Sequence, residues 1–276
     1  MSIERLAILG GGNMGRALIG GLLRRGARPE QIFVAERLDT ARQSLARDFG
    51  VLASEECAAA ASSASLIVVA VKPQDVQSTL APLRALLERN RPVIVSVAAG
   101  IRLSALESWC GAGVPIVRSM PNRPALVGAG ASGLFARPSV IPADRARAER
   151  VLQAVGEIAW VCSEDELDVV TALSGSGPAY FFLIAELLTR GAAELGLDPS
   201  VARKFALATL QGAGQLAGSS DGDLRRLRAE VTSKGGTTEA AVAVLESADL
   251  GGILTRAMEA ATRRSRELAA QFGTGR

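Results

Sequence analysis

The sequence predicts an α/β fold in which a doubly wound, mostly parallel sheet is followed by an all-α domain. Up to residue 163, short apolar runs alternate with amphipathic segments at the spacing of strand–helix–strand units. The run 66–71 is apolar on both faces, as a central strand of a parallel sheet must be. After residue 164 the strand pattern ends and only helical periodicity remains.

Apolar runs in the first part are the expected strands, and amphipathic segments between them are the expected helices. The strands are expected at 6–9, 32–35, 66–71, 93–97, 116–118, 133–135 and 159–162. The expected helices include 17–25, 40–49, 76–87 and 144–155. Regular alternation of the two sets is typical of a sheet wound in both directions and covered on both faces.

The second part of the chain is expected to contain helices only. Pro178 and Pro199 fit first helical positions, Asp198 and Asp249 fit N-caps, and Gly196 fits a C-cap. No flexible linker precedes these helices, so we expect two domains that meet directly, 1–163 and 164–276. The helices are expected at 166–173, 178–195, 199–217, 223–231, 238–246 and 249–272.

The composition limits the classes of partner and chemistry. A net charge of +3 in 276 residues gives no global field that would attract nucleic acid. The longest apolar run is far shorter than a membrane span and the chain opens without a signal peptide, so we expect no membrane partner. Three cysteines without metal-ligand spacing favour reduced, buried thiols in a cytoplasmic protein and predict no metal. Since histidine is missing, Ser-His-Asp catalysis is excluded.

The expected helix 178–195 carries apolar residues around most of its circumference, including Phe181, Phe182 and Leu187. A helix that is apolar all round is buried, and a small helical domain has little surface to bury it against. We therefore expect pairing with a second copy of the chain. The alternative is burial within the monomer.

A glycine-rich loop follows the first expected strand and opens the first expected helix. Gly10, Gly12 and Gly15 have the spacing of the dinucleotide fingerprint, with Asn13 and Met14 between the last two. In this setting the first glycine makes the turn, the second lets the backbone approach a pyrophosphate, and the helix N-terminus faces the anion. The first domain is therefore expected to be a Rossmann-like dinucleotide-binding domain.

Two adjacent residues at the end of the second expected strand give opposite indications about the cofactor. Glu36 stands at the usual distance for an acidic residue that binds ribose hydroxyls, which favours NAD. Arg37 can instead meet a 2′-phosphate, which favours NADP. We expect NADPH as the cofactor, with NADH also possible.

Three further loops follow parallel strands and should reach the edge of the sheet at which ligands bind in such folds. Their small residues would allow a flat nicotinamide ring to lie close to the backbone. The alternative interpretation of Lys72 is an ordinary lysine at the end of a strand, without a role in cofactor binding. The residues expected to contact the cofactor are Val71, Lys72, Pro73, Ala98, Ala99, Gly100 and Asn122.

A second loop of glycine and hydroxyl residues opens an expected helix near the end of the chain. Consecutive backbone N–H groups at a helix N-terminus suit a small carboxylate, and the simpler alternative is an N-cap rich in serine and threonine. Ser176, in the loop 174–180, is expected near the substrate, although that loop can also be an ordinary turn. The residues expected to bind the acid are Ser233, Gly235, Gly236, Thr237 and Thr238.

Together the segments 10–15, 71–73, 174–180 and 230–246 resemble the pyrroline-5-carboxylate reductase family. They occur in the same order as in that family and cover essentially the whole chain, and the last segment is the most specific. The resemblance implies hydride transfer from a nicotinamide dinucleotide to the C=N carbon of 1-pyrroline-5-carboxylate, giving L-proline in the last step of proline biosynthesis.

The same resemblance implies roles for individual residues. It assigns to the Thr238 hydroxyl a hydrogen bond to the ring nitrogen of the substrate, with water completing the proton transfer because threonine is too weak an acid. It also implies a homodimer through the C-terminal helices, within a homo-oligomer that can be larger, with the active site at a subunit boundary.

Two alternatives remain at this point. A β-hydroxyacid dehydrogenase has a similar first domain, but its catalytic lysine follows a glycine-rich turn, and here no lysine follows Gly177 before Lys204. A dinucleotide-binding sensor without turnover would need no acid-binding loop, which the chain has.

Overall fold

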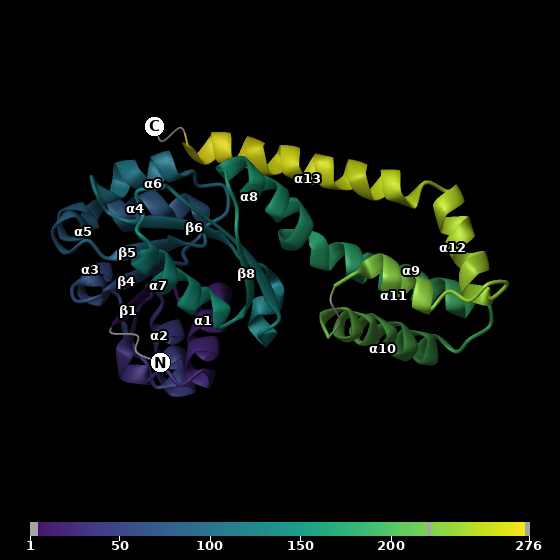
Figure 1. Cartoon of the computed structure of the whole chain (residues 1–276). Helices are drawn as coiled ribbons and strands as arrows, with labels where there is room; N and C mark the ends of the chain where they lie inside the picture. Colours follow the sequence, from purple (N-terminus) through teal and green to yellow (C-terminus); the bar gives the residue numbers. More distant parts are fainter. Residues whose placement is uncertain (1–4, 220–221, 274–276) are drawn as a thin grey trace. The chain divides into compact units, whose positions relative to one another are not determined.

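The computed structural model describes residues 5–219 and 222–273, which form two compact units (Figure 1). Of the described residues, 5–175 and 261–273 form the first unit, and 176–219 with 222–260 form the second. The expected boundary after residue 163 marks the end of the strands, but helix α8 (Glu164–Val170) belongs to the first unit. Leu167 of α8 is buried and packs at Gly133, where a Cβ would be only 3.0 Å from its side chain.

The described part of the first unit contains one eight-stranded sheet in the order β3-β2-β1-β4-β5-β6-β7-β8. Only the β6–β7 pair is antiparallel among the neighbouring strands of this sheet. The predicted fold class is therefore confirmed. The strands are β1 (Leu6–Leu9), β2 (Ile32–Ala35), β3 (Leu52–Ser54), β4 (Leu66–Val69), β5 (Val93–Ser96), β6 (Ile116–Met120), β7 (Gly130–Ala136) and β8 (Gly156–Trp160).

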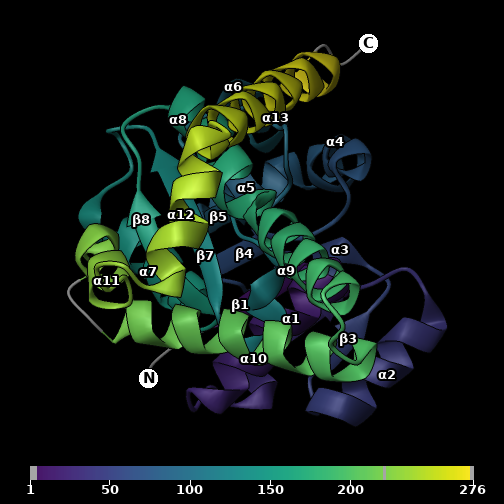
Figure 2. The ribbon, with the colours of Figure 1, turned by 90° about the vertical axis from the view of Figure 1, so that its right-hand side faces the viewer.

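Helices cover both faces of this sheet, and each face has its own apolar core (Figures 1 and 2). Alternate strand residues divide between the two cores: Ile8 and Val68 face one, whereas Leu9 and Ile67 face the other. One face carries α1 (Asn13–Arg24), α2 (Asp39–Phe49) and α7 (Pro142–Gln153). The other carries α3 (Cys57–Ala61), α4 (Val76–Leu80), α5 (Arg84–Asn90) and α6 (Leu103–Cys110).

The second unit is helical, as predicted, and α9 packs against α10 (Figure 2). Asp198 caps α10 through hydrogen bonds from the Ser200 and Val201 amides, which confirms its predicted N-cap position. Asp249 likewise caps α13, because its carboxylate accepts a hydrogen bond of 3.1 Å from the Gly252 amide, and its φ of 54° is in the left-handed region. The helices are α9 (Gly177–Glu194), α10 (Pro199–Gly218), α11 (Leu224–Glu230), α12 (Thr237–Ser247) and α13 (Leu250–Gly273), whose last turns belong to the first unit.

Three local differences from the prediction have simple causes. The edge strand β3 was not expected, because three residues are too few to show a period of two. The expected helix 76–87 is divided by the 3₁₀ turn Ala81–Leu83, which places Pro82 within its first turn. The helix expected over 166–173 ends in a π-helical segment, Thr171–Gly175.

Length and composition would allow one helical stretch in the described residues, Glu164–Glu194, to cross a membrane. Only 22% of its most apolar window is buried within the chain. One such helix is weak support for a membrane span, because core helices of other proteins pass the same test. The stretch contains α9, the helix whose apolar surface was expected to pair with a second copy.

Candidate functional site

The glycine-rich loop turns sharply between β1 and α1. Gly10 has a φ of +106°, and a Cβ on it would lie 2.7 Å from the carbonyl oxygen of Ala70. A Cβ on Gly15 would lie 2.2 Å from the carbonyl oxygen of Gly10. The Gly10 amide donates to the Ala35 carbonyl over 2.8 Å. A side chain at Gly10 would clash with the backbone that follows β4, and one at Gly15 would clash with the end of β1, so both glycines are required for the turn itself.

Gly12 is different, because nothing lies within 4 Å of the place a Cβ would take. It is exposed and forms the N-cap of α1, and the next residue, Asn13, is exposed as well. Met14 is half-buried against the core. The loop therefore presents open backbone at a helix N-terminus, an arrangement that fits a dinucleotide pyrophosphate.

The loops after β4 and β5 lie at the same edge of the sheet as the glycine loop. The amide of Ala70 donates to the carbonyl of Leu9 over 2.7 Å, and the amide of Val97 donates to that of Val69 over 3.1 Å. The three strand ends are thus neighbours in the order β1, β4, β5. The structure brings together at this edge the predicted cofactor residues Gly10, Gly12, Asn13, Met14, Gly15, Val71, Lys72, Pro73, Ala98, Ala99 and Gly100.

The predicted pair at the end of β2 lies beside the glycine loop. The Glu36 carboxylate accepts a hydrogen bond of 2.9 Å from the amide of Gly11. Arg37 extends into solvent, and its guanidinium lies 3.6 Å from the Asp75 carboxylate. Glu36 therefore places a fixed negative charge, and Arg37 a solvated positive charge, next to the glycine-rich loop.

Asn122 has a second role that its sequence position did not reveal. Its buried side-chain amide donates to the Ser174 carbonyl over 2.9 Å, and its oxygen accepts from the Ala131 amide over 2.8 Å. The residue thereby ties the loop after β6 to the π-helical segment. Nearby on β6, the buried hydroxyl of Ser119 has no hydrogen-bond partner in the described residues, which leaves it available to an ordered water or a ligand.

A charged network beside the β5 loop was not predicted. Arg102, which follows the Ala98–Gly100 loop, donates to Asp168 over 2.8 Å and to Asp165 over 3.1 Å. Glu164 accepts from the amide of Leu103 over 2.9 Å and pairs with Arg118, which is itself buried. Three carboxylates of α8 thus hold the start of α6 and the middle of β6. The sequence shows these charges but not their pairing.

The predicted acid-binding segment opens α12 in the second unit. Gly236 is the N-cap, and Gly235 has a φ of +73° that favours glycine. The Gly235 amide donates to the Glu239 carboxylate over 2.7 Å, and the Gly236 amide donates to the Ser233 carbonyl over 3.0 Å. Two of the expected amides are therefore used within the chain. Of the two hydroxyl residues that begin the helix, Thr237 is exposed and Thr238 is half-buried.

Ser176 opens α9, and its carbonyl accepts a hydrogen bond of 2.9 Å from the amide of Ala179. The residue belongs to the second unit, as do Ser233, Gly235, Gly236, Thr237 and Thr238. The predicted cofactor residues all belong to the first unit. Within the described residues no cluster of three or more metal-ligating side chains occurs.

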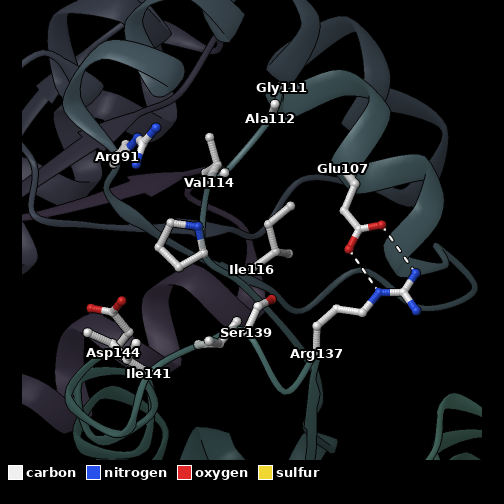
Figure 3. A pocket seen from close by; sticks show the side chains of 13 residues that line it. Arg91, Glu107, Gly111, Ala112, Val114, Ile116, Arg137, Ser139, Ile141 and Asp144 are labelled. Atoms are coloured by element: carbon white, nitrogen blue, oxygen red, sulfur yellow. Dashed lines mark hydrogen bonds and ion pairs between the residues drawn. The ribbon is translucent and has the colours of Figure 1, made fainter.

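A cavity of about 550 Å³ lies at the opposite edge of the sheet, around the start of β6 (Figure 3). Its wall includes the ion pair between Arg137 and Glu107, with 3.0 Å between Nε and Oε1 (Figure 3). Hydrogen bonding to Glu107 raises the pKa of the Arg137 guanidinium above its ordinary value. None of the predicted site residues lines this cavity, so it is separate from the cofactor edge.

Comparison with known proteins decides the family. The chain is 41% identical over 273 residues to the pyrroline-5-carboxylate reductase of Pseudomonas aeruginosa, and the match covers 99% of this chain and all of that protein. It is 40% identical to the enzyme of the same name from Mycobacterium tuberculosis, over 96% of this chain and 97% of the relative. The chain belongs to the pyrroline-5-carboxylate reductase family.

Family models and solved structures agree with this assignment. Residues 164–268 match the model described as pyrroline-5-carboxylate reductase dimerisation, and 5–100 match that of NADP oxidoreductase, coenzyme F420-dependent. The Coxiella burnetii pyrroline-5-carboxylate reductase aligns with a TM-score of 0.94 at 38% identity, over 97% of this chain and 99% of that one. The Plasmodium falciparum pyrroline carboxylate reductase, solved with NADP bound, aligns with a TM-score of 0.80 at 27% identity, over 96% and 98%.

Membership of the pyrroline-5-carboxylate reductase family confirms the resemblance seen in the sequence. The chain is accordingly an oxidoreductase that uses NAD(P)H and forms a homo-oligomer. The two alternatives, a β-hydroxyacid dehydrogenase and a sensor without turnover, do not have this support.

Proposed function

We propose that the chain reduces 1-pyrroline-5-carboxylate to L-proline with NAD(P)H. The glycine-rich loop of the first unit would bind the cofactor, and the segment 232–238 of the second unit would bind the substrate. The full-length match to pyrroline-5-carboxylate reductases carries this proposal, because it includes both segments. The open backbone at Gly12 supports the cofactor half of it.

On the cofactor side, the reduced nicotinamide supplies the hydride that adds to the C=N carbon. The chain's own part is to hold the dinucleotide. The Gly10–Gly15 loop would bind the pyrophosphate at the N-terminus of α1. Small residues after β5, Ala98 to Gly100, would let the nicotinamide end lie close to the backbone.

On the substrate side, we assign the single carboxylate of the imine to the N-terminus of α12. The amides of Thr237 and Thr238 and the hydroxyl of Ser233 supply donors there, and the helix dipole adds to their attraction for an anion. Charge-assisted hydrogen bonds contribute roughly 1.5–3 kcal/mol each, so two or three can hold so small a ligand. We place Ser176 beside this ligand on the family resemblance.

The reaction then depends mainly on orientation. Holding the imine carbon at the hydride donor can supply on the order of 7–11 kcal/mol of the barrier reduction. We assign to Thr238 a hydrogen bond from its hydroxyl to the imine nitrogen. Its hydroxyl is too weakly acidic to give up the proton, so water delivers the proton that the nitrogen acquires as the hydride adds to carbon.

We further propose that the homo-oligomer is built from dimers joined through the C-terminal helices. In the second unit, α9 leaves large apolar side chains exposed. A second copy of the chain packed against α9 would bury them. The reduced cysteines of the chain are compatible with a cytoplasmic location. The exposed apolar side chains of α9 are Phe181, Phe182, Leu183, Ile184, Leu187 and Leu188.

The test is an assay of reduced-nicotinamide absorbance with the purified protein, either cofactor and 1-pyrroline-5-carboxylate. We expect substrate-dependent loss of absorbance together with the formation of L-proline. Binding of the cofactors without any substrate-dependent oxidation would contradict the proposal and would favour the sensor.

A further inference from the structure

The cavity at the start of β6 has walls that the chain itself fixes. One wall is the loop 111–115, between α6 and β6. The Ala112 amide donates to the Glu88 carboxylate over 3.2 Å, and the same carboxylate fills the space beside Gly111, where a Cβ would lie 2.2 Å from its oxygen. Glu88 of α5 therefore holds this loop in position.

The second wall is the loop 137–141, between β7 and α7. The Arg145 guanidinium donates to the carbonyls of Arg137 and Val140, each over 3.1 Å, and the Val140 amide donates to the Arg137 carbonyl over 3.0 Å. Both loops thus keep their shape through contacts of the chain itself. A cavity of about 550 Å³ between such walls has the size and the preformed shape of ligand sites.

Arg91 brings a positive charge to this cavity (Figure 3). It is the C-cap of α5, and its amide donates to the Leu87 carbonyl over 2.8 Å. Its guanidinium lies against Gly113, where a Cβ would be 3.4 Å from it. Among the residues that the structure describes, the Arg91 side chain has no hydrogen bond or ion pair. Its guanidinium is therefore free to bind an anion.

Asp144 brings a negative charge to the same cavity from the first turn of α7, and its side chain is only 16% exposed. Within the described part of the chain, the one partner of its carboxylate is Arg147, one turn further along the helix at 3.4 Å. Such pairs on a helix surface hold a carboxylate weakly. Asp144 therefore keeps one carboxylate oxygen for a cationic group.

Figure 3 shows Arg91 and Asp144 on one side of the cavity. On the other side lies the ion pair between Glu107 and Arg137, whose two hydrogen bonds of 3.0 and 3.2 Å let these charges satisfy each other. The buried apolar side chain of Ile116 lies between the two charged sides. The cavity thus offers one group for an anion, one group for a cation and an apolar wall.

We propose that this cavity binds a small zwitterion with an apolar body, namely an aliphatic α-amino acid. Arg91 binds its carboxylate, Asp144 binds its ammonium group, and the apolar wall at Ile116 receives its side chain. An anion alone would place its charge near the Asp144 carboxylate, and a cation alone would place its charge near the Arg91 guanidinium. A ligand with both charges leaves neither group opposed.

The site is separate from the two segments assigned to the reductase, so this inference does not depend on the proposed function. None of the residues assigned to the cofactor or to the imine lines the cavity. Loss of amino-acid binding here would leave the reductase in place, and a protein that never forms proline can still bind an amino acid here.

The experiment is titration calorimetry of the whole protein with L-leucine and two close relatives of it. Leucinamide lacks the carboxylate and 4-methylpentanoate lacks the ammonium group, whereas both keep the same side chain. The titrations are repeated with Arg91→Gln and Asp144→Asn. The matched controls are Arg89→Gln, which removes an exposed charge of α5 outside the cavity, and Asp39→Asn, which removes a charge from the first turn of α2.

We expect L-leucine to bind about tenfold or more tightly than either relative, since each relative has lost one charge-assisted contact. Asp144→Asn should weaken L-leucine binding about tenfold, and Arg91→Gln about fivefold, because Arg91 is more exposed to water. Both control variants should stay within about twofold of the wild type. Leucinamide should be insensitive to Arg91→Gln, because it has no carboxylate for the guanidinium to bind.

Three results overturn the inference. The first is no binding of L-leucine up to about 10 mM. The second is binding that both relatives match. The third is binding that Arg91→Gln and Asp144→Asn leave unchanged, which would place the amino acid at another site, such as the segment before α12. If Asp144→Asn does not fold, Arg91→Gln and the two relatives decide.

Discussion

Asp168 of α8 and Ser265 of α13 are joined by a hydrogen bond of 2.7 Å, although 97 positions separate them in the chain. Both belong to the first unit, and both are buried. They lie near the two points, 175/176 and 260/261, at which the chain leaves this unit and returns to it. The Asp168 carboxylate also accepts from Arg102 over 2.8 Å. One carboxylate thus holds together α8, the last turns of α13 and the start of α6.

Replacing this carboxylate should therefore be costly. We expect Asp168→Ala to lower the free energy of unfolding by about 2–3 kcal/mol, because Arg102 and Ser265 both lose a buried partner. The figure is below the usual range for a buried pair since the Arg102 side chain is 23% exposed. Urea unfolding measures the free energy of unfolding of Asp168→Ala and of a control variant, Asp165→Ala. Asp165 binds the same arginine but is 70% exposed, so its loss should cost less than about 1 kcal/mol. Equal losses would contradict the argument.

The glycine loop allows folding to be separated from binding. Gly12→Ala should leave the protein folded, with a loss of about 1 kcal/mol or less, because its Cβ meets nothing within 4 Å. The same methyl group would occupy the place of the pyrophosphate, so we expect the dissociation constant for NADH to rise about tenfold or more. Calorimetry and thermal unfolding of the same sample measure both effects. Gly10→Ala is the contrasting variant: its left-handed φ and close Ala70 oxygen should lower the melting temperature strongly.

The sequence predicted best those features whose causes are local. Strands β1 and β2 were found to the residue, since both are apolar runs bounded by turn residues. The position of the glycine-rich loop between β1 and α1 also followed from the strand and helix expected on either side of it. By contrast β3 has three residues, and no periodicity can be recognised in so short a segment.

Features that depend on distant partners could not be predicted. Arg102 meets Asp168 across 66 positions, and Asn122 meets Ser174 across 52. Nothing in the neighbourhood of either residue shows such a partner, because the fold alone brings them together. Fewer backbone amides than expected are free to bind a carboxylate before α12, because the Gly235 amide donates to the Glu239 carboxylate. Its spacing of four residues could have been noticed in the sequence.

The three cysteines should react at very different rates. Burial raises the pKa of the Cys110 thiol to about 12, and burial also raises the pKa of Cys57. The expectation that all three thiols are buried is wrong for Cys162, which is exposed. The thiolate is the reactive form, so a raised pKa means less reaction at pH 8. With a chromogenic disulfide reagent we expect a fast phase for Cys162, a slow phase for Cys57, and no reaction of Cys110 before unfolding. Cys162→Ser should remove the fast phase only. Reaction of all three thiols at one rate in the folded protein would be incompatible with this burial.

Thr238 should affect turnover without affecting the cofactor. We expect Thr238→Ala to lower kcat/KM for 1-pyrroline-5-carboxylate by roughly 10- to 100-fold, because one directed hydrogen bond to the imine nitrogen is lost as that nitrogen gains its proton. The dissociation constant for NADH should stay within about twofold of the wild-type value, since no cofactor residue is changed.

The matched control is Thr255→Val on α13, which removes an exposed threonine hydroxyl that donates to the Gly251 carbonyl of its own helix. Steady-state kinetics and calorimetry on the three proteins separate the two effects. If Thr238→Ala retains wild-type kinetics, the hydroxyl has no part in the reaction, and orientation at the helix N-terminus with water as the proton source would have to suffice. If instead it loses NADH binding as well, the threonine acts on the fold of the protein and not on the imine.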